Sequence, residues 1–165
     1  MAEHVEIVEV GPRDGLQNES VTIPTSAKAE LIRRLAAAGL RHIEATSFVH
    51  PKWIPQLADA VELVQSLDFS GGIQYSALVP NMRGLQRALE TPIREVAVFM
   101  SASESHNRSN INKSMAETFP VLAEVVQAAK EHGLRVRGYV STAFGCPFEG
   151  TVPMDNVLLV VGKLV

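Results

Sequence analysis

A run of charged and amide side chains follows the first apolar segment of the chain. Arg13 and Asp14 are adjacent, Gln17 lies three residues further on, and Gly11 and Pro12 set a turn just before them. A carboxylate such as Asp14 is a suitable hard ligand for Mg²⁺ or Mn²⁺, and the guanidinium of Arg13 can stabilise an oxyanion. An isolated surface pair of this kind contributes under about 1 kcal/mol. The significance of the pair therefore depends on where the fold places it.

Charged and hydroxyl side chains also occur in segments with the apolar pattern of strands. Glu44 ends one such segment, and Arg137, Tyr139 and Ser141 share one face of another because side chains alternate along a strand. Burying a charge costs several kcal/mol unless it is paired. Two interpretations follow: Arg137 and Glu44 form a structural ion network, or the polar groups face a ligand. Glu44 lies at the carboxyl end of its segment, and this position favours the second interpretation, in which Glu44 faces a ligand.

Short β-rich runs alternate with longer helical runs along the whole chain. The patterns predict strands at 5–10, 41–46, 72–78, 94–100 and 134–140, and helices at 25–38, 55–67, 83–89, 115–132 and from 154 onward. Five repetitions of strand followed by helix indicate an α/β fold with a parallel sheet and right-handed crossovers.

Two parallel architectures are compatible with this alternation. A doubly wound sheet usually has a glycine-rich phosphate-binding turn after its first strand, and the turn here, GPRDGLQNE, is charged and amidic instead. Long polar loops follow the predicted strands, which is typical of the catalytic rim of a TIM (β/α)8 barrel. A whole barrel takes about 250 residues. We therefore expect residues 1–165 to form a single partial barrel of about five βα units, without its C-terminal part.

Composition excludes several classes of partner and location. Fifteen Lys and Arg residues against eighteen Asp and Glu give a net charge of −3 without a basic block, which argues against nucleic-acid and membrane partners. No apolar run approaches the roughly 20 residues that a membrane span requires. A single cysteine, Cys146, precludes an intramolecular disulfide, and no targeting peptide is visible. A cytoplasmic protein is expected.

Several long motifs resemble one enzyme family. VEIVEVGPRDGLQNES, IEATSFVHPKWIPQLAD and RVRGYVSTAFGCPFEG occur in collinear order, and together they resemble the hydroxymethylglutaryl-CoA lyases, barrel metallolyases with a DRE-like signature and a pyruvate carboxyltransferase-like domain. The resemblance implies cleavage of 3-hydroxy-3-methylglutaryl-CoA to acetyl-CoA and acetoacetate, a reaction of leucine degradation and ketone body formation. It also implies a divalent cation, Mg²⁺ or Mn²⁺, with no organic cofactor.

The resemblance also implies roles for individual residues. Asp14 would be a metal ligand, Arg13 would bind substrate and stabilise the enolate, and Glu44 would hold Arg13 in place at the catalytic site. The remaining expected substrate-binding residues are Gln17, Ser47, Tyr139 and Ser141. The partner is an acyl-CoA substrate. An open strand edge and the apolar stripe of the last helix would invite association into a homo-oligomer.

The chain departs from the family pattern in two respects. None of its five histidines forms the His-x-His pair that supplies further metal ligands in the family, and the family's catalytic cysteine lies in a later loop, so Cys146 is interpreted as structural. We therefore expect little or no turnover from this chain alone. The alternatives are a non-catalytic half-barrel that binds acyl-CoA, on its own or completed by a partner chain, and a related lyase or synthase acting on a different acyl-CoA.

Overall fold

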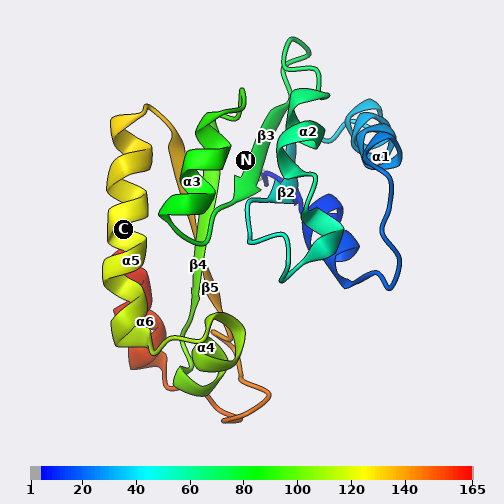
Figure 1. The fold of residues 1–165 in the computed structure, drawn as a ribbon. Helices are drawn as coiled ribbons and strands as arrows, with labels where there is room; N and C mark the ends of the chain where they lie inside the picture. Colours follow the sequence, from blue (N-terminus) through cyan, green and yellow to red (C-terminus); the bar gives the residue numbers. More distant parts are fainter. Residues whose placement is uncertain (1–4, 165) are drawn as a thin grey trace.

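Runs of small and β-branched apolar residues build a parallel sheet at the centre of the molecule (Figure 1). The computed structural model describes residues 5–164. Its five strands pair in chain order, each parallel to the next: β1 (Val8–Glu9), β2 (His42–Ser47), β3 (Gln74–Leu78), β4 (Glu95–Ser101) and β5 (Arg135–Ser141). Sequential parallel pairing is the order found in a (β/α)8 barrel. The predicted fold class is confirmed.

Helices connect the strands and cover one side of the sheet (Figure 1). They are α1 (Thr25–Ala37), α2 (Ala60–Gln65), α3 (Met82–Leu89), α4 (Glu104–Ile111), α5 (Met115–Glu131) and α6 (Met154–Leu164). α5 begins at a capping box, in which Ser114 and Glu117 satisfy each other's backbone N–H groups. It ends before Gly133, whose φ of +72° suits a glycine.

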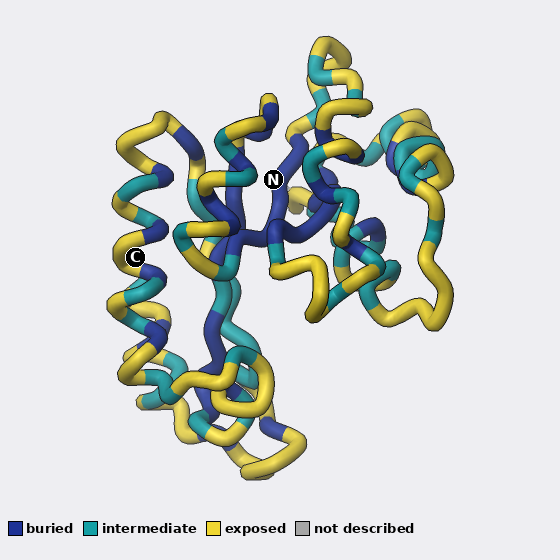
Figure 2. The backbone as a smooth tube through the Cα atoms, viewed as in Figure 1, coloured by how far each residue is buried: buried dark blue, intermediate teal, exposed yellow. Residues whose placement is uncertain are grey.

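The core lies between the strands and the inward faces of these helices, and Figure 2 shows β2, β3 and β4 as largely buried and the outer surfaces of the helices as exposed. A charged side chain of α1 is buried there as well. Lys28 of α1 is 1% exposed and donates hydrogen bonds to Asp59 Oδ1 at 2.6 Å and to the backbone oxygen of Gln56 at 2.5 Å. This ion pair attaches α1 to the segment that follows β2, which carries part of the pocket described below.

Three elements differ from the prediction by more than two residues. β1 spans two residues instead of six, because it pairs only with β2 and only at Val8 and Glu9. The helix predicted at 55–67 is divided into a 3₁₀ turn, η3 (Pro55–Leu57), and α2. α4 was predicted as loop because it lacks an apolar stripe, and its only buried residue is the polar Asn107. Ser103 caps its N-terminus.

The loop after β5 contains the cysteine. Cys146 is buried, its Sγ lies 3.0 Å from Ser103 Oγ, and its backbone pairs with Gly150. The thiol therefore joins the loops that follow β4 and β5. Within residues 5–164, no helix combines the length and the apolar character needed to cross a membrane.

Candidate functional site

A pocket of about 690 Å³ opens beside the carboxyl ends of the strands. Six of the residues singled out from the sequence line it, and they come from the turn after β1, from the end of β2 and from the end of β5: Arg13, Asp14, Gln17, Ser47, Tyr139 and Ser141. The seventh, Glu44, lies beneath them, fully buried. The structure thus brings all seven together, and their individual roles remain predictions.

Glu44 joins two of the pocket side chains. Its Oε1 accepts a hydrogen bond from Arg13 Nε at 2.5 Å, and its Oε2 accepts one from Tyr139 Oη at 2.9 Å. We call these three residues the Arg13/Glu44/Tyr139 cluster. Burial raises the pKa of Tyr139, and the charge of Glu44 and its hydrogen bond raise it further. The phenol therefore remains a proton donor to the carboxylate at any physiological pH.

The backbone turn that carries Arg13 is tightly wound. It forms a short π-helical segment, η1 (Gly11–Gly15), in which the carbonyl oxygen of Val10 accepts hydrogen bonds from the N–H groups of Arg13 and Asp14. The side chain of Glu9 accepts a hydrogen bond from Gly11 N at 2.6 Å. A Cβ at position 11 would lie 2.7 Å from that carboxylate oxygen, so a larger residue there would displace the Glu9 carboxylate.

Asp14 projects from this turn into the pocket opening. Its Oδ1 accepts hydrogen bonds from Arg13 Nη1 at 2.6 Å and from Gln17 Nε2 at 3.1 Å, and 54% of the side chain is exposed. Neither Asp14 Oδ2 nor Gln17 Oε1 accepts a hydrogen bond from another residue in the described part of the chain. Two oxygen atoms are thus available to a ligand. No group of three or more His, Cys, Asp or Glu side chains within 5–164 could hold a metal by itself.

Ser47 presents an unsatisfied hydroxyl to the pocket. The residue is 2% exposed, and its Oγ has no hydrogen-bond partner among residues 5–164. Leaving a buried hydroxyl unpaired costs about 1–3 kcal/mol, and a ligand oxygen in the pocket would remove that cost. Ser47 therefore points to a polar ligand more directly than the other lining residues do.

The lining also includes residues outside these seven. Asn110 and Ile111 of α4 and Phe99 of β4 form part of the wall, and Trp53 borders the opening with 72% of its surface exposed. The length of the loops after β2 and β4 was the signal for them.

The proposed ion network between Arg137 and Glu44 is wrong. Arg137 instead donates to Glu95 Oε1 from Nε at 3.2 Å and from Nη2 at 3.0 Å. Glu95 begins the neighbouring strand, whereas Glu44 is already occupied by Arg13 and Tyr139. Arg137 therefore belongs to a structural pair below the pocket.

A family model described as HMGL-like matches residues 4–165. The chain belongs to the HMGL-like family. This HMGL-like chain is 54% identical over 154 residues to hydroxymethylglutaryl-CoA lyase YngG of Bacillus subtilis, covering 93% of its own length and 52% of the relative. It is 49% identical over 160 residues to the hydroxymethylglutaryl-CoA lyase of Pseudomonas mevalonii, covering 97% of its own length and 53% of the relative. The chain thus spans about half the length of these curated relatives.

Solved structures agree with the family assignment. The crystal structure of the Bacillus subtilis HMG-CoA lyase superposes with a TM-score of 0.94 at 53% identity, over 97% of this HMGL-like chain and 54% of that protein. An Acinetobacter baumannii HMG-CoA lyase, solved with coenzyme A and 3-methylmalate, gives a TM-score of 0.89 at 39% identity, over 96% and 52% of the two chains. The resemblance to this family and the interpretation as part of a barrel are both confirmed.

Proposed function

We propose that this chain supplies the arginine and aspartate side of a site that cleaves 3-hydroxy-3-methylglutaryl-CoA to acetyl-CoA and acetoacetate. One observation carries the proposal: Arg13, Asp14 and Ser47 line a single pocket. Buried Glu44 holds the Arg13 guanidinium there, and the Ser47 hydroxyl has no hydrogen-bond partner among the described residues. Support also comes from relatives that are hydroxymethylglutaryl-CoA lyases and from a similar structure solved with coenzyme A.

The reaction places two demands on the site. The tertiary hydroxyl loses its proton and becomes the ketone of acetoacetate, while the electron pair of the breaking C–C bond moves onto the acetyl-CoA enolate. That enolate then takes up a proton. A fixed cationic donor beside the thioester oxygen stabilises the charge that develops there.

Arg13 is suited to stabilising the enolate. Its Nε and Nη1 are occupied by Glu44 and Asp14, whereas Nη2 has no acceptor among the described residues. Nη2 is therefore the donor available to a substrate oxygen. Glu44 acts as a positioning residue, because it prevents the guanidinium from rotating away, and Tyr139 holds the other oxygen of Glu44.

The oxygen atoms of Asp14 and Gln17 fit a hard divalent cation. Asp14 Oδ2 and Gln17 Oε1 would contact Mg²⁺ or Mn²⁺, which bind carboxylate and amide oxygens. When bound, the cation lowers the pKa of a coordinated substrate hydroxyl. Ser47 and Ser141 would donate to or accept from the remaining polar groups of the substrate.

The test is a calorimetric titration of the chain with 3-hydroxy-3-methylglutaryl-CoA, with and without Mg²⁺. Arg13→Gln should weaken binding about tenfold or more, because a charge-assisted hydrogen bond is lost. Asp14→Asn should remove the effect of Mg²⁺. Arg33→Gln, on the exposed face of α1, is the control and should change neither. Equal affinities in the wild type, Arg13→Gln and Asp14→Asn would overturn the proposal.

A further inference from the structure

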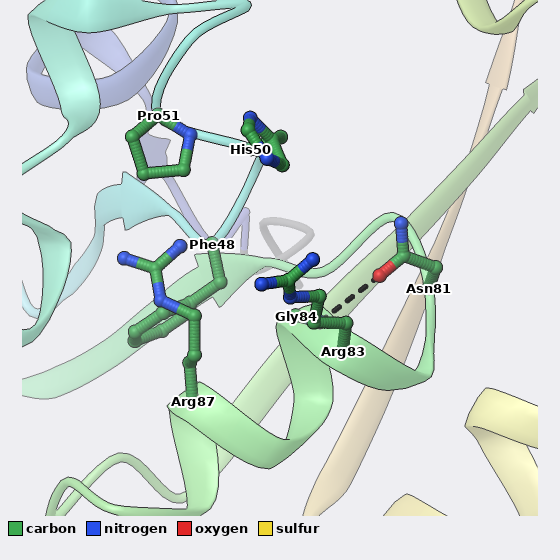
Figure 3. A pocket seen from close by; sticks show the side chains of 7 residues that line it. All are labelled: Phe48, His50, Pro51, Asn81, Arg83, Gly84 and Arg87. Carbon is green, nitrogen blue, oxygen red and sulfur yellow. Dashed lines mark hydrogen bonds between the residues drawn. The ribbon is translucent and has the colours of Figure 1, made fainter.

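One cavity of the chain lies away from the candidate site, on the other face of the sheet. The cavity drawn in Figure 3 lies beside the candidate site, because its His50 follows Val49, which lines that site. A larger cavity, of about 540 Å³, lies between α1 and the segment that joins α2 to β3. Its Tyr75 and the Leu78 of the candidate site are three residues apart on β3, so their side chains point to opposite faces. The larger cavity is therefore separate from the candidate site.

This cavity exists because α2 is short. α1 has 13 residues and α2 has six, which gives lengths of about 20 Å and about 9 Å. α2 therefore covers only part of α1, and residues 66–73 bound the rest of the cavity. In this segment Asp68 Oδ1 accepts hydrogen bonds from Ser70 N at 2.8 Å and from Ser70 Oγ at 2.6 Å. We call the cavity the outer groove and define it by six of its lining residues: Ala36, Arg41, Leu67, Asp68, Ile73 and Tyr75.

Tyr75 brings an unpaired hydroxyl to the outer groove. Only 6% of the residue is exposed, and its ring packs edge-on against Phe69 with 5.1 Å between the ring centres. The hydroxyl has no hydrogen-bond partner among residues 5–164. Burial raises the pKa of Tyr75, and the charge of Asp68 raises it further, so the phenol remains a proton donor at neutral pH. A buried donor without an acceptor is costly, and a ligand in the groove would supply that acceptor.

The outer groove also contains one cation and one anion without partners of opposite charge. The Arg41 side chain is exposed and forms no ion pair within residues 5–164. Asp68 uses Oδ1 for Ser70, and its Oδ2 accepts no hydrogen bond from the described part of the chain. The hydrogen bonds from Ser70 lower the pKa of Asp68, so this carboxylate is ionised at neutral pH. The nearby Glu30 and Arg33 instead satisfy each other through two hydrogen bonds of 2.7 Å.

We infer that the outer groove binds a free α-amino acid with a large apolar side chain. The ligand carboxylate accepts hydrogen bonds from Arg41 and from the Tyr75 hydroxyl, and the ligand ammonium donates to Asp68 Oδ2. A simple anion would leave Asp68 unpaired, and a simple cation would leave Arg41 unpaired, whereas a zwitterion satisfies both. Leu67 and Ile73 supply the apolar wall on which the side chain lies. The volume of the groove leaves room for a side chain the size of an aromatic ring.

The experiment separates the two charges of the ligand. L-Phenylalanine, 3-phenylpropanoate, which lacks the ammonium, and 2-phenylethylamine, which lacks the carboxylate, are titrated calorimetrically into the chain. L-Alanine tests the need for the apolar side chain. Each titration is repeated with three variants and two controls. Arg41→Gln changes an exposed side chain without an ion pair, so its folding is not at risk. Asp68→Asn keeps an oxygen for Ser70, and Tyr75→Phe keeps the ring. The controls, Arg94→Gln and Asp155→Asn, make the same charge changes at exposed positions outside the groove.

L-Phenylalanine should bind the wild type at least about tenfold more tightly than either single-charge analogue does, because each analogue loses one charge-assisted hydrogen bond. Arg41→Gln and Asp68→Asn should each weaken binding of L-phenylalanine about tenfold, Tyr75→Phe should weaken it less, and the controls should not change it. L-Alanine should bind more weakly than L-phenylalanine. Absence of binding by L-phenylalanine, equal affinity for either analogue, or unchanged affinity in both Arg41→Gln and Asp68→Asn would overturn the proposal. Equal affinity for L-alanine would reject the requirement for a large apolar side chain.

Discussion

Replacing Glu44 by glutamine tests the arrangement on which the candidate site depends. The carboxylate is fully buried and accepts hydrogen bonds from Arg13 Nε and Tyr139 Oη. Removing one partner of a buried ion pair typically costs 3–5 kcal/mol. The lower end applies here because Arg13 retains Asp14 at Nη1 and its side chain is 13% exposed. We therefore expect Glu44→Gln to reduce the free energy of unfolding by about 3 kcal/mol.

The measurement is urea unfolding followed by circular dichroism, together with a thermal melt. For a chain of this size, a loss of about 3 kcal/mol lowers Tm by about 6–12 °C. Glu62→Gln makes the same chemical change at an exposed site on α2 and should remain within about 0.5 kcal/mol of the wild type. If Glu44→Gln behaves like Glu62→Gln, the buried pair does not exist and the explanation for the position of Arg13 fails.

Two further predictions concern glycine packing and a helix cap. Gly84→Ala should destabilise the chain by about 2 kcal/mol, because its Cβ would meet the backbone oxygen of Phe48 at 2.8 Å. Gly162→Ala lies in an open position of α6 and should instead stabilise the chain by about 0.5–1 kcal/mol. Equal midpoints of urea unfolding for the two variants would contradict this prediction. Hydrogen bonds from the backbone and side chain of Ser114 lower the pKa of Glu117, so this carboxylate contributes stability above its ordinary pKa of 4.5 that is lost as the pH falls through the lowered pKa. Glu117→Gln should therefore be less stable than the wild type at pH 7, and the gap in unfolding free energy should close below pH 4.5; a gap independent of pH would refute this account.

Much of the candidate site could be predicted from local patterns. Alternation along a strand placed Tyr139 and Ser141 on one face, and the position of Glu44 at a strand end placed it near the turn that carries Arg13. The parallel sheet then brings these strand ends to one edge. Patterns of period two and the motif after β1 were sufficient because the relevant contacts follow directly from sheet geometry.

Features that depend on side-chain contacts between distant segments could not be predicted. α4 is polar except for Ile111 at its end, and it is held by the buried amide of Asn107, which accepts from Ser101 N and donates to Thr118 Oγ1. A helix of this kind leaves no apolar period to detect, so α4 was not predicted as a helix. The partner of Arg137 was also mistaken, because only the register between strands shows that Glu95 is within reach.

The contact between Glu44 and Tyr139 joins positions 95 residues apart in the chain. Closing so large a loop carries a high entropic cost and slows folding. The pocket is therefore complete only when all five strands have paired. A small molecule that binds in the pocket would therefore raise the free energy of unfolding of the whole sheet and not only that of a single loop.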